Sequence, residues 1–97
     1  MVTEIAVLEI TPGAEAAFAE AYRQVRHEVV ETEGCRSVRM TRGVESPSRF
    51  VLLVEWDSVE AHERNFRATD RFVRWRAAIS PHFAQPPAVG HYVDIDG

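Results

Sequence analysis

The chain of 97 residues has 45% hydrophobic and 27% charged residues, the composition of one ordinary globular domain, which we expect to span residues 1–97. Its formal net charge is −4, and its eleven basic residues are interspersed with acids, so we expect no nucleic-acid partner. A chain of this size buries only about 60–65% of its unfolded surface, so a pocket forms more easily between layers or subunits than inside the single core.

Cysteine content and the start of the chain bear on its location. Cys35 is the only cysteine, which excludes an internal disulfide and fits a reducing compartment. The first ten residues, MVTEIAVLEI, lack the basic and long apolar regions of a signal peptide. No apolar run approaches the roughly 18 residues that span a bilayer. We therefore expect a cytoplasmic protein without membrane contact.

The first predicted elements are a strand and a helix separated by a breaker. Residues 3–10, TEIAVLEI, are rich in β-branched and aliphatic side chains and end at Thr11-Pro12-Gly13. We expect Thr11 to cap the following helix, with Pro12 at its first position, where a missing N–H costs nothing. Apolar residues then recur every three or four positions from 14 to about 31, which predicts one helix that Gly34 ends as a C-cap.

Two strands are predicted next. Residues 35–42, CRSVRMTR, alternate in polarity, as a half-exposed strand does. After a turn at 43–48, residues 50–56, FVLLVEW, are almost entirely apolar. A run of this kind indicates the most buried, central strand.

A second helical region follows the central strand. Asp57 is expected to cap it, and Glu60, three residues later, to complete a capping box. The helix is predicted from 58 to about 68, with a break near Thr69-Asp70 and a second segment to about 79. The helical region is thus two short segments and not one helix.

The last predicted strand, residues 88–95, completes a β-α-β-β-α-β order. This order is ferredoxin-like, an α+β fold in which helices cover one face of an antiparallel sheet. Because FVLLVEW is apolar on both faces, Leu8, Leu52, Val54 or their neighbours are expected on the uncovered face. We expect two copies to pair through this face as a homodimer.

The stretch 62–76, HERNFRATDRFVRWR, is the main candidate for a binding wall. His62 lies on the inward side of the first helical turn, where the N-terminal amides disfavour a cationic imidazole and leave it able to accept a proton. Phe66, Phe72 and Trp75 recur at helical spacing, which is typical of core packing and also of a cavity wall. Four arginines lie mainly off this stripe and are expected on a solvated face: Arg64, Arg67, Arg71 and Arg74.

Four further side chains complete the candidate site. Asn65 is the only asparagine, and Arg76 could hold an enolate or phenolate oxygen by charge-assisted hydrogen bonds. Trp56, at the end of the central strand, is a packing anchor or a cavity wall. His91 alternates with Tyr92 along the last strand, so only one of the two faces the helices. The four histidines are dispersed without ligand spacing, so no metal site is expected.

The run FVLLVEWDSVEAHERNFRATDRF, followed by Trp75-Arg76 and a closing PP-x-V-x-HY segment, resembles the antibiotic biosynthesis monooxygenase family. The likeness covers almost the whole chain and implies that family's dimeric α+β barrel. It also implies a cofactor-independent monooxygenase that oxidises an aromatic, polyketide- or quinol-like small molecule with O2, the deprotonated substrate supplying the electrons. No cofactor is implied, and haem is disfavoured because Trp75 and Arg76 stand where the haem-degrading branch needs an axial histidine.

The resemblance also implies roles for individual residues. Trp56 matches the family's strand-end tryptophan, and Arg76 matches a helix arginine implicated at the site. His62 stands where the oxygenases carry a tyrosine, and Leu52 where they carry an asparagine that holds the substrate oxygen. The predicted catalytic residues are His62, Arg76 and Asn65, and the predicted substrate-binding residues are Trp56, Phe66, Phe72, Trp75 and His91.

Two alternatives to the oxygenase stay open. The first is a small-molecule isomerase or cyclase on the same fold, which would use the same base without O2. The second is a non-catalytic dimeric ligand-binding protein, in which the polar residues of the stretch are structural. An open space between sheet and helices would favour the catalytic hypotheses, whereas a filled or collapsed space would favour a purely structural role for these residues.

Overall fold

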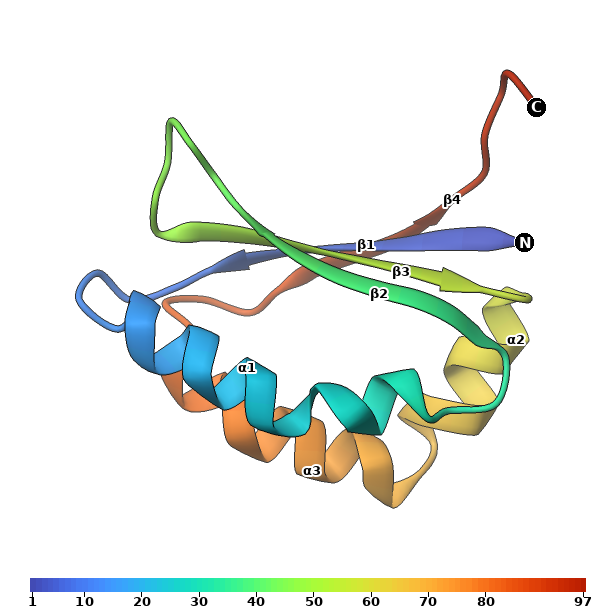
Figure 1. Ribbon diagram of the computed structural model, residues 1–97, viewed down its shortest axis with the longest axis horizontal. Coiled ribbons are helices and arrows are strands. Elements are labelled where there is room, and N and C mark those ends of the chain that lie inside the picture. Colours follow the sequence, from blue (N-terminus) through green and yellow to red (C-terminus); the bar gives the residue numbers. More distant parts are fainter.

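A computed structural model describes residues 1–97 as one four-stranded sheet with all helices on one face (Figure 1). In chain order its elements are β1 (Val2–Glu9), α1 (Glu15–Val30), β2 (Cys35–Arg42), β3 (Arg49–Trp56), α2 (Val59–His62), the π-helix η1 (Glu63–Arg67), α3 (Asp70–Ile79), the 3-10 turn η2 (Ser80–His82) and β4 (Ala88–Tyr92). The predicted order and the predicted break in the second helical region are confirmed.

The sheet has the strand order β2-β3-β1-β4, with every neighbouring pair antiparallel. This is the ferredoxin-like topology, and β3 is an inner strand, as its apolar composition predicts. The last strand is shorter than the predicted 88–95. Tyr92 pairs with Thr3, and β1 has only Val2 beyond that pair, so residues 93–95 find no strand to bond to.

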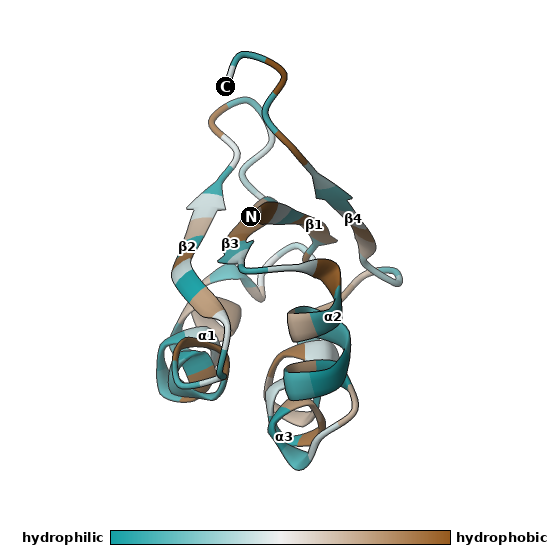
Figure 2. Ribbon diagram, turned by 90° about the vertical axis from the view of Figure 1, so that its right-hand side faces the viewer, coloured by the Kyte–Doolittle hydropathy of each residue, from teal (hydrophilic) through white to brown (hydrophobic).

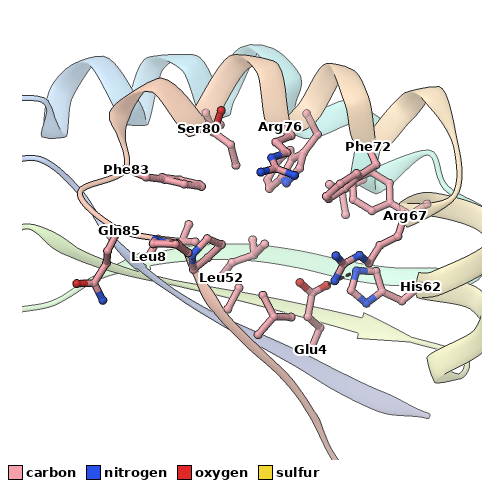
Figure 3. Close-up of a pocket in the computed structure, with 18 of the residues that line it drawn as sticks. Glu4, Leu8, Leu52, His62, Arg67, Phe72, Arg76, Ser80, Phe83 and Gln85 are labelled. Atoms are coloured by element: carbon pink, nitrogen blue, oxygen red, sulfur yellow. Dashed lines mark ion pairs between the residues drawn. The ribbon is translucent and has the colours of Figure 1, made fainter.

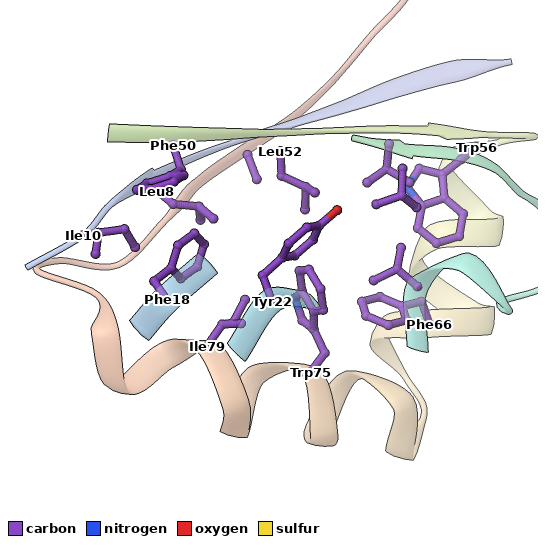
Figure 4. Packing of buried hydrophobic residues seen from close by; sticks show 14 of the residues in the cluster. Leu8, Ile10, Phe18, Tyr22, Phe50, Leu52, Trp56, Phe66, Trp75 and Ile79 are labelled. Atoms are coloured by element: carbon purple, nitrogen blue, oxygen red, sulfur yellow. The ribbon is translucent and has the colours of Figure 1, made fainter. Parts of the chain in front are cut away.

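The core lies between the sheet and the helices (Figure 4). Phe18 from α1 meets Phe50 from β3 edge-on at 4.8 Å, and Tyr22 meets Trp75 of α3 at 6.0 Å. Seen from the end, α1 lies under one side of the sheet and α2 with α3 under the other (Figure 2). The helices α1 and α3 are therefore held by aromatic contacts to the sheet and to each other.

A buried carboxylate also joins α1 to α3. The side chain of Glu28 is only 7% exposed, and it accepts two hydrogen bonds from Arg74 and one from Arg71. Arg74 is 55% exposed, as expected for a solvated face, and Arg71 is 32% exposed, but both also pair with this acid, which the prediction did not include. The helix periodicity identified their side of α3 correctly, but it could not reveal that an acid of α1 packs against it.

The opposite face of the sheet carries apolar side chains that no element covers. Leu8, Leu52 and Val54 point to the helices and are at most 4% exposed. Side chains alternate along a strand, so their neighbours point outward, among them Ile5, Val7, Val51 and Leu53, all half-buried. Of the two sets that the sequence left open, the neighbours form the bare face.

Both predicted helix caps are wrong. Residues 11–13 form a turn in which Gly13 has φ +96°, and α1 begins later, after Ala14, without a side-chain cap. At the second helical region Ser58 caps, its Oγ accepting from the N–H of Ala61 at 3.1 Å. Asp57 instead accepts two hydrogen bonds from the guanidinium of Arg36, a partner that is distant in sequence.

Gly34 lies four residues beyond the last helical residue and is not the immediate cap of α1. Its φ of +92° is the left-handed conformation that glycine adopts without strain. A Cβ at this position would come within 2.7 Å of the Ala61 methyl group. The glycine thus brings the turn before β2 close against α2, the helix that carries His62.

None of the helices combines the length and apolar character needed to cross a bilayer.

Candidate active-site cavity

A cavity of about 680 Å³ lies between the sheet and α3 (Figure 3). Its floor is the inward face of β1 with Leu52 of β3, and its roof includes Phe72, Trp75 and Arg76. Phe83 and the proline-rich segment 85–87 close the end nearer the start of β4. A largely apolar cavity with a few convergent polar groups is the usual form of a small-molecule site.

The polar groups gather at one end of the cavity, where β1, β3, β4 and α2 meet. His62 is only 3% exposed, and its ring stacks on Trp56 with centroids 4.9 Å apart. Its Nδ1 lies 2.8 Å from Nε2 of His91, and its Nε2 lies 3.4 Å from Oε1 of Glu4. The same Glu4 oxygen accepts a 3.0 Å hydrogen bond from Nε1–H of Trp56. These four residues form one buried acid–base cluster.

The local structure explains how His62 reaches this position. Ser58 caps α2 and starts the turn, and His62 is the last residue of α2 before the π-helix η1. His62 and Phe66 are four residues apart and both point inward, as positions i and i+4 of a helix do, with ring centroids 6.1 Å apart. Single π-turns inside helices are frequent at functional sites.

Burial shifts the two acid–base groups of the cluster towards their neutral forms. The pKa of His62 is lowered to about 4, chiefly by desolvation and then by the nearby His91 and Arg67. The expected direction is correct, but its main cause is burial and not the helix N-terminus. Desolvation raises the pKa of Glu4, against the opposing effects of the Trp56 hydrogen bond and the Arg67 charge.

Two arginines line the cavity without a carboxylate partner. None of the ion pairs of the chain includes Arg67 or Arg76. The Arg67 guanidinium lies 5.2 Å from the ring centre of Phe72, and Arg76 extends from α3 towards the cavity (Figure 3). A guanidinium that lines a cavity and has no internal partner is suited to hold an anionic oxygen of a ligand.

The structure brings together most of the residues that the sequence singled out, but not Asn65. His62, Phe66, Phe72, Trp75 and Arg76 line the cavity. Trp56 and His91 do not line the cavity themselves and are linked to it through their hydrogen bonds to Glu4 and His62.

Asn65 is exposed, and its Nδ2 donates to the backbone carbonyl of Glu33 at 2.9 Å. It therefore ties η1 to the turn before β2 and does not reach the cavity. Asn65 is close to His62 along the chain, but its side chain points away from the cavity on the other side of the helical turn.

Two charged residues of the cavity lining were missed from the sequence. Glu4 stands on the same face of β1 as Ala6 and Leu8, so an acid at an inward position of an apolar strand was the available signal. Arg67 follows the inward Phe66, and a regular helix would turn it to solvent. Arg67 is exposed, but it also lines the cavity, and no pattern in the sequence marks that contact.

His62, His91 and the exposed Glu63 place potential ligand atoms within 4.8 Å of one another. The histidines are 29 residues apart in sequence, so spacing could not reveal this juxtaposition. The expectation of no metal rested on that spacing alone. Chelation therefore belongs among the experiments on this site.

The arrangement is able to accept a proton and to hold an anion. Glu4 and His62 supply the acid–base groups at one end, Arg67 and Arg76 supply positive charge, and aromatic rings supply flat walls. The alternative of a filled or collapsed space between sheet and helices does not agree with a cavity of about 680 Å³.

Comparisons with known proteins agree with one another. The family antibiotic biosynthesis monooxygenase matches residues 1–78. The uncharacterized protein YczJ of Bacillus subtilis is 30% identical over 95 residues, which cover 98% of this chain and all of that protein. A crystal structure of a candidate antibiotic biosynthesis monooxygenase from Bordetella bronchiseptica superposes with a TM-score of 0.93 at 35% identity, covering 97% of this chain and 96% of that one.

The cofactor-independent oxygenase SnoaB of Streptomyces nogalater shares the fold, with a TM-score of 0.82 over 96% of this chain and 91% of its own. At 17% identity this likeness concerns the fold alone.

Proposed function

Because the chain belongs to the antibiotic biosynthesis monooxygenase family, we propose that it is a cofactor-independent monooxygenase of an aromatic, polyketide- or quinol-like small molecule. The observation that carries the proposal is the cavity itself. A buried acid–base cluster lies at one end of an aromatic-walled space, and an unpaired arginine projects from its roof. The description of SnoaB as cofactor-independent supports the same chemistry by analogy of fold.

In this reaction the substrate supplies the electrons. An anthrone-type substrate loses a proton to the cluster around His62, and the charge moves to its oxygen, opposite Arg76. The resulting anion reduces O2, and its CH2 group becomes a carbonyl. One oxygen atom enters the product and the other leaves as water, so no external reductant is needed. The protein contributes binding, proton transfer and stabilisation of the oxyanion.

We also propose that two copies pair through the bare face of the sheet. Ile5, Val7, Val51 and Leu53 form an apolar strip there that no helix covers. An uncovered apolar sheet face of a monomer usually marks an interface, and a second identical face is the simplest complement. The free thiol of Cys35 fits a reducing compartment, and we place the homodimer in the cytoplasm.

Oxygen uptake with a panel of anthrones and hydroquinones tests the activity. The wild-type protein should consume O2 and incorporate one atom of isotopically labelled O2 into the product, and His62→Ala should be slower. Equal rates for the two proteins would remove His62 from the mechanism. Turnover of a lactone or an enolisable ketone without O2 would instead favour an isomerase or cyclase.

A further inference from the structure

Both ring nitrogens of His62 are directed at residues of the cluster. Its Nδ1 faces His91 at 2.8 Å, and its Nε2 faces Oε1 of Glu4 at 3.4 Å. Stacking on Trp56 holds the ring in this orientation, with the two planes only 16° apart. The ring of His62 is thus oriented towards Glu4 and His91, although its Nε2 makes no hydrogen bond in the protein.

Glu4 has a carboxylate oxygen without a partner in the protein. Its Oε1 is engaged by Trp56 and His62, whereas its Oε2 has no hydrogen-bond partner in the protein. No buried side-chain oxygen of the chain lacks a partner, so Oε2 is not sealed in the core. Glu4 lines the cavity, and its carboxylate is drawn beside His62 and Arg67 in Figure 3. The free oxygen of Glu4 thus faces the space that a ligand would fill.

We propose that Glu4 is the catalytic base of this cavity, and that His62 and His91 are positioning residues behind it. The O–H or C–H bond of the substrate breaks, the proton passes to Oε2 of Glu4, and the electron pair stays on the substrate, opposite Arg76. This inference rests on the proposed function for the identity of the substrate, and it names the atom that receives the proton.

The surroundings of Glu4 suit this role. The charged and titratable groups around it are His62 of α2, His91, which is its register partner on β4, Arg67 and Glu63 of η1, and the Cys35 thiol of β2. Burial raises the pKa of Glu4, and a carboxylate with a raised pKa binds a proton more strongly. The Trp56 N–H and the Arg67 charge oppose this shift, so the carboxylate keeps access to its ionised form.

A coloured phenol that does not react with O2 tests the assignment without oxygen chemistry. 2-Hydroxyanthraquinone is yellow as a phenol and red as a phenolate, and it is titrated into each protein at pH 6. The wild-type protein should produce the red band on binding. Glu4→Gln keeps the shape of the side chain and an acceptor for Trp56, and its band should fall by about tenfold or more, equivalent to one pKa unit. Glu60→Gln, the same change at an exposed site on α2, should match the wild type.

The direction in which Glu4→Gln changes the phenolate band tests whether Glu4 is the base. If Arg76 alone drives ionisation and the proton goes to water, removal of the Glu4 charge strengthens the phenolate band. An unchanged or stronger band, or no band in the wild-type protein, overturns the inference. If Glu4→Gln does not fold, as judged by circular dichroism, Glu4→Asp replaces it. Its carboxylate is one methylene further from the cavity, so a weaker band is expected, and an unaltered band contradicts the proposal.

The positioning role has its own readout. His91→Gln should shift the pH midpoint of the phenolate band, because His91 is hydrogen-bonded to His62 and stands opposite Glu4 in the register of β1 and β4. A structural role alone would leave that midpoint unchanged.

The role of Glu4 and the proposed oxygenase activity can be refuted separately. If the red band depends on Glu4 but no substrate gives O2 uptake, the oxygenase is refuted and Glu4 remains the base. If O2 is taken up but wild type and Glu4→Gln give equal bands, the oxygenase stands and Glu4 is not the base.

Discussion

The buried imidazole of His62 should make the stability of the protein depend on pH. Its pKa is about 4 in the folded protein, against 6.5 for an unperturbed histidine. Between these values the unfolded chain binds a proton that the folded chain does not bind. Stability is therefore lost as pH falls from about 7 towards 4, and linkage gives a loss of about 2 kcal/mol at pH 5. Because His62 is only 3% exposed, solvent screening does not reduce this value greatly.

The assay compares wild type with His62→Gln by urea unfolding at pH 7.5 and pH 5, at one protein concentration. The difference in unfolding free energy between the two proteins should fall by about 2 kcal/mol on acidification. Glu4 acts in the opposite direction, since its raised pKa makes the folded state take up that proton first. Repeating the comparison with Glu4→Gln in both proteins removes this contribution. A difference that stays constant with pH in that background would refute the assignment of His62 as a buried neutral imidazole.

Four further outcomes are expected. Glu28→Gln should lower the unfolding free energy by about 1–2 kcal/mol by breaking the buried link to α3, whereas the exposed Glu31→Gln should change it by under about 0.5 kcal/mol in the same urea assay. Leu53→Arg should convert a dimer to a monomer in light scattering, whereas Val73→Arg, on an exposed side of α3, should not. Arg76→Gln should lower kcat for the O2-consuming substrate by about 100-fold, since the charge opposite the oxyanion is lost. Dialysis against a chelator should leave O2 uptake unchanged, and loss of uptake restored by a divalent metal would assign the His62 cluster to a metal.

The elements of the fold follow from local patterns. Apolar side chains at spacings of two, or of three and four, mark a strand or a helix, because only the matching periodicity buries them together. The break at Thr69-Asp70 was readable in the same way, and so was the central place of the apolar run 50–56. The helix caps could not be predicted in this way. Thr11 and Asp57 have side chains suited to capping, but α1 begins after Ala14 and the Asp57 carboxylate bonds Arg36.

The candidate site was readable only in part. The inward position of His62, Phe66 and Trp75 follows from helix periodicity, and the structure places all three on the cavity. Asn65 satisfied the same spacing but bonds the carbonyl of Glu33, so closeness in sequence did not bring it to the cavity. A π-helix rotates the residues after it, and nothing in the sequence marks where the extra residue lies.

Local patterns in the sequence are enough to identify the class of fold, the uncovered apolar face and the histidine that enters the core. Which groups that histidine meets depends on how distant elements pack in the folded chain. The pairing of β1 with β4 sets Glu4 opposite His91, and α2 then places His62 between them. The physical reason is that periodicity reports which side of an element is buried, whereas the register between strands distant in the chain decides what lies across from it. The acid–base cluster exists only because three such elements meet.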